Sequence, residues 1–206
     1  MRNQCLLSGA RIQTDVFETT REAAKAMDHR IEAIMPPNYR SFHWAGYCIG
    51  FALGGFFDGI LLHQVLQWHH FLSGWTQTPF NDPRIQILAD GLFHAAMYVI
   101  AAVGIWKLVR ARHVFALKAA NRMLGANALI GFGSWHVLDS VLSHWILGIH
   151  HVRMDVPDRL FWDVLWFLLF GVLFVAAGIL LRRWREPPPS GKDRRARSRS
   201  AIGPAL

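Results

Sequence analysis

Four long apolar stretches constrain this 206-residue chain more than any other feature. They cover about residues 43–68, 86–108, 126–149 and 160–182. A helix needs about 20 mostly apolar residues to cross the hydrocarbon core of a bilayer, and each stretch reaches that length. Hydrophobic residues make up 52% of the chain, which is a high share for a soluble domain of this size. The sequence therefore predicts an all-α integral membrane protein with four transmembrane helices packed as a bundle.

Positive charge is distributed unevenly among the segments that flank and connect these stretches. Six Lys and Arg residues lie in the first 42 positions, five lie in residues 107–123 and eight follow residue 181. The other two connections hold only Arg84, Arg153 and Arg159. Because cytoplasmic loops are enriched in Lys and Arg, we expect a multi-pass protein of the bacterial inner membrane with both termini in the cytoplasm. The net charge of +8 then needs no nucleic-acid partner to explain it.

The two ends of the chain are predicted to lie on the cytoplasmic side. Residues 1–42 include an amphipathic segment between positions 15 and 35, with apolar residues at near-helical spacing that favour a helix on the membrane surface. Residues 185–206 combine prolines with a polybasic run and predict a disordered tail. Residues 43–184 between them are expected to form one transmembrane domain.

Two of the apolar stretches carry the same arrangement of ionisable residues. In each copy an Asp is followed after four residues by a His, and then after five residues by a His-His pair. The second copy follows the first by 81 residues. Ionisable side chains are costly in hydrocarbon and usually mark functional sites. The residues are Asp58, His63, His69 and His70 in the first copy, and Asp139, His144, His150 and His151 in the second.

The similarity extends into the apolar stretch that follows each copy. The segment from Asp90 to His94 resembles that from Asp158 to Trp162, which favours an internal repeat of about residues 43–109 and 124–184. The expected architecture is two helical hairpins related by a pseudo-two-fold axis along the membrane normal. His94 has no histidine counterpart in the second half.

Helical geometry predicts that the polar residues meet in the outer half of the membrane. With a rise of about 1.5 Å per residue, the motif aspartates lie near mid-membrane, and His63, His94 and His144 lie at one depth on three helices. Seven residues make nearly two turns, so His70 is expected on the same face as His63, about 10 Å away.

Three imidazoles from three helices favour a transition-metal site that serves metal handling or a membrane oxidoreductase. Imidazole nitrogen suits copper, zinc or iron, and we favour copper. Aspartates nearby can bind the ion directly or accept the second ring N–H of a histidine. The predicted metal site comprises His63, His94, His144, Asp58, Asp139 and Asp90, with His69, His70, His136, His150 and His151 as a surrounding shell or second site.

Three other functions are compatible with the same residues. His63 and His144 can clamp the iron of a haem b group from opposite sides, as in an electron carrier. A metal-dependent membrane hydrolase would use a metal-bound water. A proton relay, or a structural subunit of a respiratory complex, would use the Asp and His column without metal. Besides the lipid bilayer, a homodimer or a respiratory-complex partner is compatible with the chain, and no catalytic residue is singled out.

The residues that carry these motifs are similar to those of a family of small bacterial membrane proteins, catalogued as domain of unknown function 2243. The match covers about residues 43–182. It rests on the segment from Gly54 to His70, the segment from Asp90 to His94, and the segment from Trp135 to Asp139 with the histidines that follow. The resemblance implies a four-span membrane protein and an association with oxidase and copper-handling genes. The family has no assigned activity, so no catalytic residue is carried over.

Overall fold

Four helical rods make up the part of the chain that the computed structural model describes, which is Glu22 and residues 38–184. Over these residues there is no strand. The predicted tail and, apart from Glu22, the predicted amphipathic segment of residues 15–35 lie outside the described part. The first rod is α2 (Tyr39–Asp58) with π-helix η1 (Gly59–Val65), and the second is α3 (Pro83–Arg110). The third is α4 (Ala120–Asp139) with π-helix η3 (Ser140–Ile146), and the 3-10 helix η2 (Arg112–Ala116) precedes it. The fourth consists of α5 (Arg159–Trp166), π-helix η4 (Phe167–Val172) and α6 (Leu173–Arg183).

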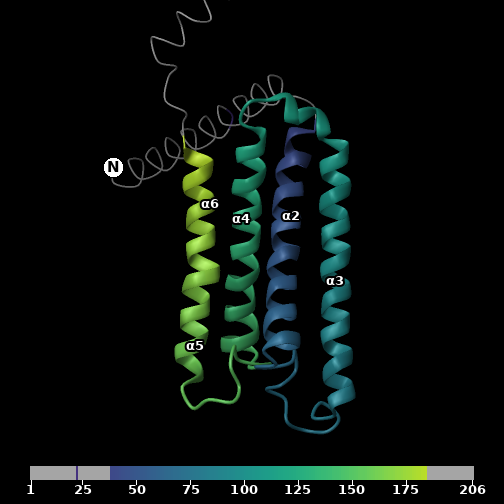
Figure 1. Ribbon diagram of the computed structural model, residues 1–206, viewed down its shortest axis with the longest axis vertical. Helices are drawn as coiled ribbons and strands as arrows, with labels where there is room; N and C mark the ends of the chain where they lie inside the picture. The colour runs from purple at the N-terminus through teal and green to yellow at the C-terminus, as the bar shows by residue number, and fades with distance from the viewer. Residues whose placement is uncertain (1–21, 23–37, 185–206) are drawn as a thin grey trace, which may run out of the picture.

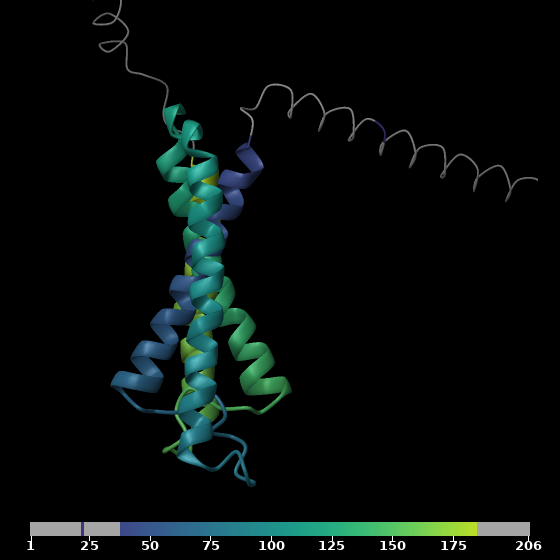
Figure 2. The same cartoon turned by 90° about the vertical axis from the view of Figure 1, so that its right-hand side faces the viewer.

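The rods lie in a row in the order α6, α4, α2, α3 (Figure 1), and the perpendicular view shows this row edge-on (Figure 2). The central rods α2 and α4 pack against each other, α3 packs on α2, and α6 packs on α4. This differs from the predicted bundle, in which every helix would border a common core. A membrane helix can leave an apolar flank uncovered because lipid tails are as apolar as a protein interior.

Helix ends follow local sequence signals. Asp82 caps α3, because its Oδ1 accepts a hydrogen bond of 2.8 Å from the backbone N–H of Arg84. Pro83 fits the first turn, where its missing N–H has no helical partner to lose. At the other end, Lys107 and Arg110 lie near the exposed carbonyls of the last turn, where positive charge is favourable.

Three rods are long and apolar enough to cross a membrane, namely residues 39–65, 83–110 and 159–183. The rod of residues 120–146 is not among them, and it carries polar side chains along its length, including Arg122, Asn127 and His136. Membrane-spanning helices are thus supported for three predicted stretches. The fourth predicted span, over 126–149, stays a prediction.

The central rods approach each other closely because small residues line their interface. A Cβ atom on Gly50 of α2 would overlap the backbone of Ala128 in α4, and one on Gly131 of α4 would overlap the carbonyl oxygen of Tyr47. Small residues at helix contacts let backbones pack tightly in membranes. Gly50 and Gly131 therefore serve the close packing of the two central helices.

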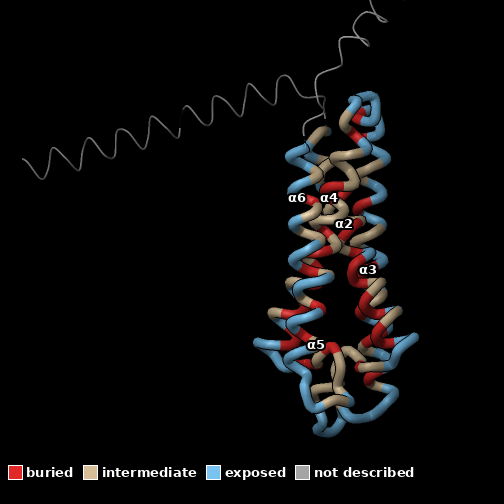
Figure 3. The backbone as a smooth tube through the Cα atoms, turned by 60° about the vertical axis from the view of Figure 1, so that its left-hand side comes forward, coloured by how far each residue is buried: buried red, intermediate tan, exposed pale blue. Residues whose placement is uncertain are grey.

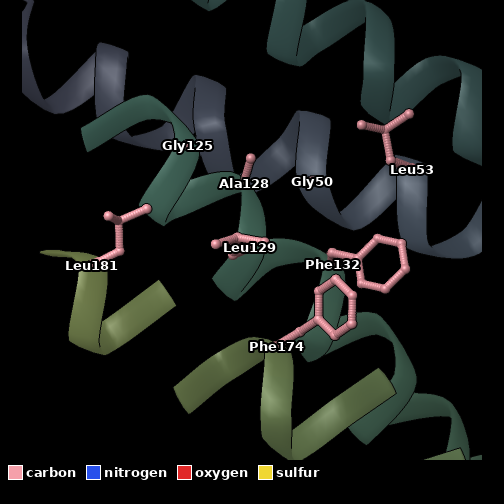
Figure 4. A pocket seen from close by; sticks show the side chains of 8 residues that line it. All are labelled: Gly50, Leu53, Gly125, Ala128, Leu129, Phe132, Phe174 and Leu181. Carbon is pink, nitrogen blue, oxygen red and sulfur yellow. The ribbon is translucent and has the colours of Figure 1, made fainter. Parts of the chain in front are cut away.

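Buried residues concentrate where the rods face each other, and exposed residues lie on their outer sides (Figure 3). Many of the exposed residues are large and apolar, among them Leu88, Tyr98 and Leu180. A shallow apolar groove runs between α2, α4 and α6, and its lining includes Leu53, Leu129, Phe132 and Phe174 (Figure 4). Its surface is almost entirely apolar. Such a surface is suited to contact with lipid tails.

The substitution Gly50→Ala should destabilise the protein, because the added methyl group overlaps the α4 backbone. Overpacking of this kind costs about 1–3 kcal/mol. Gly125→Ala is the matched control, since a Cβ atom there meets nothing within 4 Å. Thermal unfolding in detergent should show a lower Tm for Gly50→Ala and an unchanged or higher Tm for Gly125→Ala, because Ala favours helix over Gly.

Candidate metal centre

The helical geometry changes at the motif in both central rods. Each α-helix ends at the motif aspartate, Asp58 or Asp139, and continues as a seven-residue π-helix that contains His63 or His144. The wider turn is seen in the hydrogen bonds from Leu66 N–H to the carbonyl of Leu61 and from Leu147 N–H to the carbonyl of Leu142, both 2.8 Å. Short π-helical segments occur frequently at functional sites.

The chain reverses direction directly after each π-helix. Gln67 has a φ of 51° and Gly148 a φ of 60°, a left-handed conformation that ends the helix. The two π-helical ends diverge, and the loops that follow turn back between them (Figure 2). The His-His pairs therefore lie on loops, His69 and His70 on one and His150 and His151 on the other.

Two groups of three potential metal ligands form where the loops meet the helices. Within each group the nitrogen and oxygen atoms that can bind a metal all lie within 4.8 Å of one another. Every member is 4% exposed or less. We call them the first group, which is Asp58, His63 and His69, and the second group, which is Asp139, His144 and His150.

Each histidine of the two groups has its Nδ1 atom next to an acceptor. The Nδ1–H of His63 donates to Asp90 Oδ1 at 3.0 Å. The rings of the loop histidines donate to backbone carbonyls, His69 to Val152 at 2.8 Å and His150 to Phe71 at 2.9 Å. The Nδ1 of His144 lies 3.2 Å from Asp163 Oδ1. These contacts fix the orientation of the rings.

The opposite ring nitrogen of all four histidines is buried without a hydrogen-bond partner among the described residues. This holds for the Nε2 atoms of His63, His69, His144 and His150, and also for Nδ1 of His144. The nearest carboxylate to the Nε2 atoms of His144 and His150 is Asp139 of their own group, at 3.1 and 3.6 Å. Leaving a buried acceptor unsatisfied costs about 1–3 kcal/mol, so buried nitrogens of this kind in one place are suited to binding a ligand. A nitrogen lone pair held in place by a hydrogen bond on the other side of the ring is the usual state of a metal-binding histidine.

His69 lies on the loop outside the helical rods, and its environment favours the neutral ring. Burial, and then the neighbouring His150 and His63, hold the pKa of His69 well below its ordinary value. The neutral form has a free lone pair on one nitrogen. Its Nε2 atom is therefore available to a metal at neutral pH.

Comparison of the chain with known protein families gives a match. The family described as "Predicted membrane protein (DUF2243)" matches residues 45–185, well over half of the chain. The chain belongs to this family. Searches of the curated proteins and of the solved structures find no match.

Two buried carboxylates outside the groups hold the centre of this DUF2243 protein together. Asp90 accepts from Nδ1 of His63 and of His70, the latter at 2.7 Å, and from the backbone N–H of Phe71 at 2.8 Å. Asp90 is 1% exposed. It therefore joins the π-helix, the following loop and α3.

Asp163 plays the same part in the second half. It lies 3.2 Å from His144 Nδ1, accepts from His151 Nδ1 at 2.6 Å, and accepts from the backbone N–H of Val152 at 2.9 Å. The sequence similarity between residues 90–94 and 158–162 instead made Asp158 the counterpart of Asp90. This correspondence is wrong, because the equivalent contacts are made by Asp163. The spacing from the His-His pair to the buried carboxylate is eight residues shorter in the second half, since Asp163 follows His151 by 12 residues and Asp90 follows His70 by 20.

A signal in the sequence could have identified Asp163. It is the one acidic residue inside the apolar stretch of residues 160–182, as Asp90 is inside residues 86–108. A single carboxylate in each of the two apolar stretches indicates which residues correspond better than local sequence similarity does. A carboxylate is costly in hydrocarbon and is therefore kept only where it has a role.

Of the predicted metal ligands, His94 and Asp90 lie outside both groups, and so do His70, His136 and His151 of the predicted shell. His94 on α3 has its ring against Phe56 and its Nε2 next to Gly59, where a Cβ atom would overlap it. His136 is fully buried, and its Nδ1 accepts a hydrogen bond of 3.1 Å from Trp166 Nε1. The predicted meeting of His63, His94 and His144 is therefore replaced by the two groups, in which the loop histidines stand in place of His94.

The predicted position of His70 on the same helical face as His63 is wrong, because the helix ends before residue 70. The prediction assumed an unbroken α-helix through residue 70, whereas the helix widens at Gly59 and ends at Val65. Both rings instead contact the same carboxylate, that of Asp90.

Replacing the newly identified carboxylate tests its part in the fold. Asp163→Asn should lower the free energy of unfolding by about 3 kcal/mol, because an amide cannot accept from two imidazoles and a backbone N–H at once. Asp158→Asn is the control, since Asp158 is exposed and its side chain makes no capping hydrogen bond. Denaturant unfolding in detergent measures both, and equal stability of the two variants would contradict the assignment.

Proposed function

We propose that this membrane protein binds transition-metal ions, one in each of the two three-ligand groups. The observation that carries the proposal is the arrangement of four buried imidazoles with Nδ1 next to an acceptor and Nε2 without a hydrogen-bond partner outside its own three-ligand group. Each group adds one carboxylate, so the ligand set per ion is two histidines and one aspartate. That set is typical of divalent transition metals.

Copper is the ion we favour, with zinc and iron as the alternatives. Sites built from imidazole and carboxylate generally bind Cu²⁺ more tightly than the other divalent first-row metals. A bound ion would supply Lewis acidity or, for copper and iron, one-electron chemistry. The protein supplies ring orientation through Asp90, Asp163 and the loop carbonyls, and it excludes bulk water from the ligands.

We further propose that residues 120–146 form a fourth span and that the two halves are a duplicated hairpin. Contacts that recur with the 81-residue offset support the duplication, among them those from His69 to Val152 and from His150 to Phe71. The distribution of Lys and Arg supports cytoplasmic termini in a bacterial inner membrane, with the centre in the outer half. Partners beyond the bilayer, whether a second copy or a respiratory subunit, stay predictions.

Ring positions favour separate ions over a haem held between His63 and His144. The ring of His69 lies 4.6 Å from that of His63, and the ring of His150 lies 5.0 Å from that of His144, between centroids. The space beside each proposed haem ligand is thus filled by another imidazole. A hydrolase would need room for a substrate at ligands that are all 4% exposed or less.

Metal content of the purified protein tests the proposal. Inductively coupled plasma mass spectrometry on the detergent-purified chain should give up to two ions per chain, one for each group. The double variant His69→Ala, His150→Ala should lose them, because each group then keeps only one imidazole and one carboxylate. An absorption spectrum of the same sample should show no Soret band.

His94→Ala separates the structure-based ligand set from the one that the sequence predicts. Because His94 lies outside both groups, this variant should keep the wild-type metal content. Loss of metal on this substitution would return His94 to the ligand set. Wild-type protein that neither contains nor binds copper, zinc or iron would contradict the proposed function and favour a proton relay or a packing role.

A further inference from the structure

The loop of each half reaches into the other half at the centre. His69, from the first loop, is oriented by the carbonyl of Val152 in the second loop, at 2.8 Å. His150, from the second loop, is oriented by the carbonyl of Phe71 in the first, at 2.9 Å. The ligand that each loop contributes to its own group is therefore held in place by the opposite loop.

Further contacts lock the loops to each other. The rings of His69 and His150 stack with centroids 4.4 Å apart and planes 8° from parallel. The backbone N–H of Gly74 donates to the carbonyl of Ile149 at 2.6 Å, and that of Met154 donates to the carbonyl of Trp68 at 3.2 Å. Neither loop can move away without disturbing the histidine of the other.

We infer that the two groups load metal as one unit, so that tight binding in either group requires the other group to be intact. The inference rests on the proposed function. Contacts that orient a metal-binding histidine are typically worth about 10–100-fold in metal affinity. Here those contacts come from the other half, so an ion that orders one loop also orients the imidazole that serves the second ion.

The carboxylates reduce the repulsion that two neighbouring cations would exert on each other. Asp139 lies with Oδ2 3.1 Å from His144 Nε2 and Oδ1 3.6 Å from His150 Nε2. Asp58 and Asp139 of the other group repel each other as like charges, and a cation bound in either group relieves this repulsion. Each ion is therefore close to negative charge from both halves, which favours joint occupancy.

Single-ligand variants test the coupling. His63→Ala removes one ligand from the first group alone, and His144→Ala removes one from the second group alone. The full-length protein in detergent is titrated with Co²⁺, whose visible absorption bands report ligand binding, and the bound metal is counted by mass spectrometry. We expect each variant to bind Co²⁺ at its intact group about tenfold more weakly than wild type or worse.

The outcomes separate the coupling from the proposed function. Variants that each keep one Co²⁺ ion at wild-type affinity would overturn the coupling and leave the metal-binding proposal standing. Wild-type protein that binds no Co²⁺ would overturn both.

A variant that changes no ligand guards against a simple folding defect. A Cβ atom on Gly74 would overlap the carbonyl oxygen of Gly148, so Gly74→Ala should push the loops apart. Its Co²⁺ affinity should fall about tenfold at both groups, as expected when the contacts that orient ligands are lost. Gly125→Ala is the control, since it adds a methyl group in open space, and it should bind as wild type does. Unchanged affinity in a folded Gly74→Ala variant would contradict the inference.

Discussion

Each half of the protein depends on one buried carboxylate, Asp90 or Asp163. Both accept from a loop histidine and from the backbone N–H of the following residue, and both lie next to the ring of the π-helical histidine. A buried charge is tolerated only when it is fully compensated, and these contacts supply that compensation. The same contacts hold the loop against the helix ends. The hydrogen bonds to Asp90 and Asp163 therefore both hold the loops in position and compensate the buried negative charge.

The π-helices explain how the centre fits into a thin row of rods. Where the central rods diverge, an ordinary α-helical end would leave an open wedge between them. The π-helices begin at Gly59 and Ser140, and the loops that follow turn back between the diverging ends (Figure 2). The imidazole rings of His69 and His150 on these loops pack against each other and against those of His63 and His144. On the side of the centre toward Gly50, close packing at this glycine brings α2 and α4 together. Within residues 38–184, the helical rods and the two loops are enough to enclose the ligands.

Much of this arrangement could be predicted from the sequence, because hydrophobic length and intramembrane charge are strong signals. They identified all four rods, both motif aspartates and the histidines around them. The path of the chain after His63 could not be predicted, since a π-helix has no pattern distinct from an α-helix and Gln67 gives no sign of a left-handed conformation. Asp163 was missed because loop length differs between the halves. The row was missed because hydropathy reports apolar surface and not which neighbour, protein or lipid, covers it.

The crossed loops have the form of an isologous interface. When His69 contacts the residue equivalent to Phe71 in the other half, His150 contacts Phe71 itself, and such reciprocity is the signature of a two-fold axis. If the proposed duplication is right, a single ancestral hairpin would have contained every residue of the motif. It would have lacked the contacts from a second loop that complete the centre. Pairing of two such hairpins would have completed the centre, and divergence after fusion of their genes would account for the unmatched His94 and the shorter second loop.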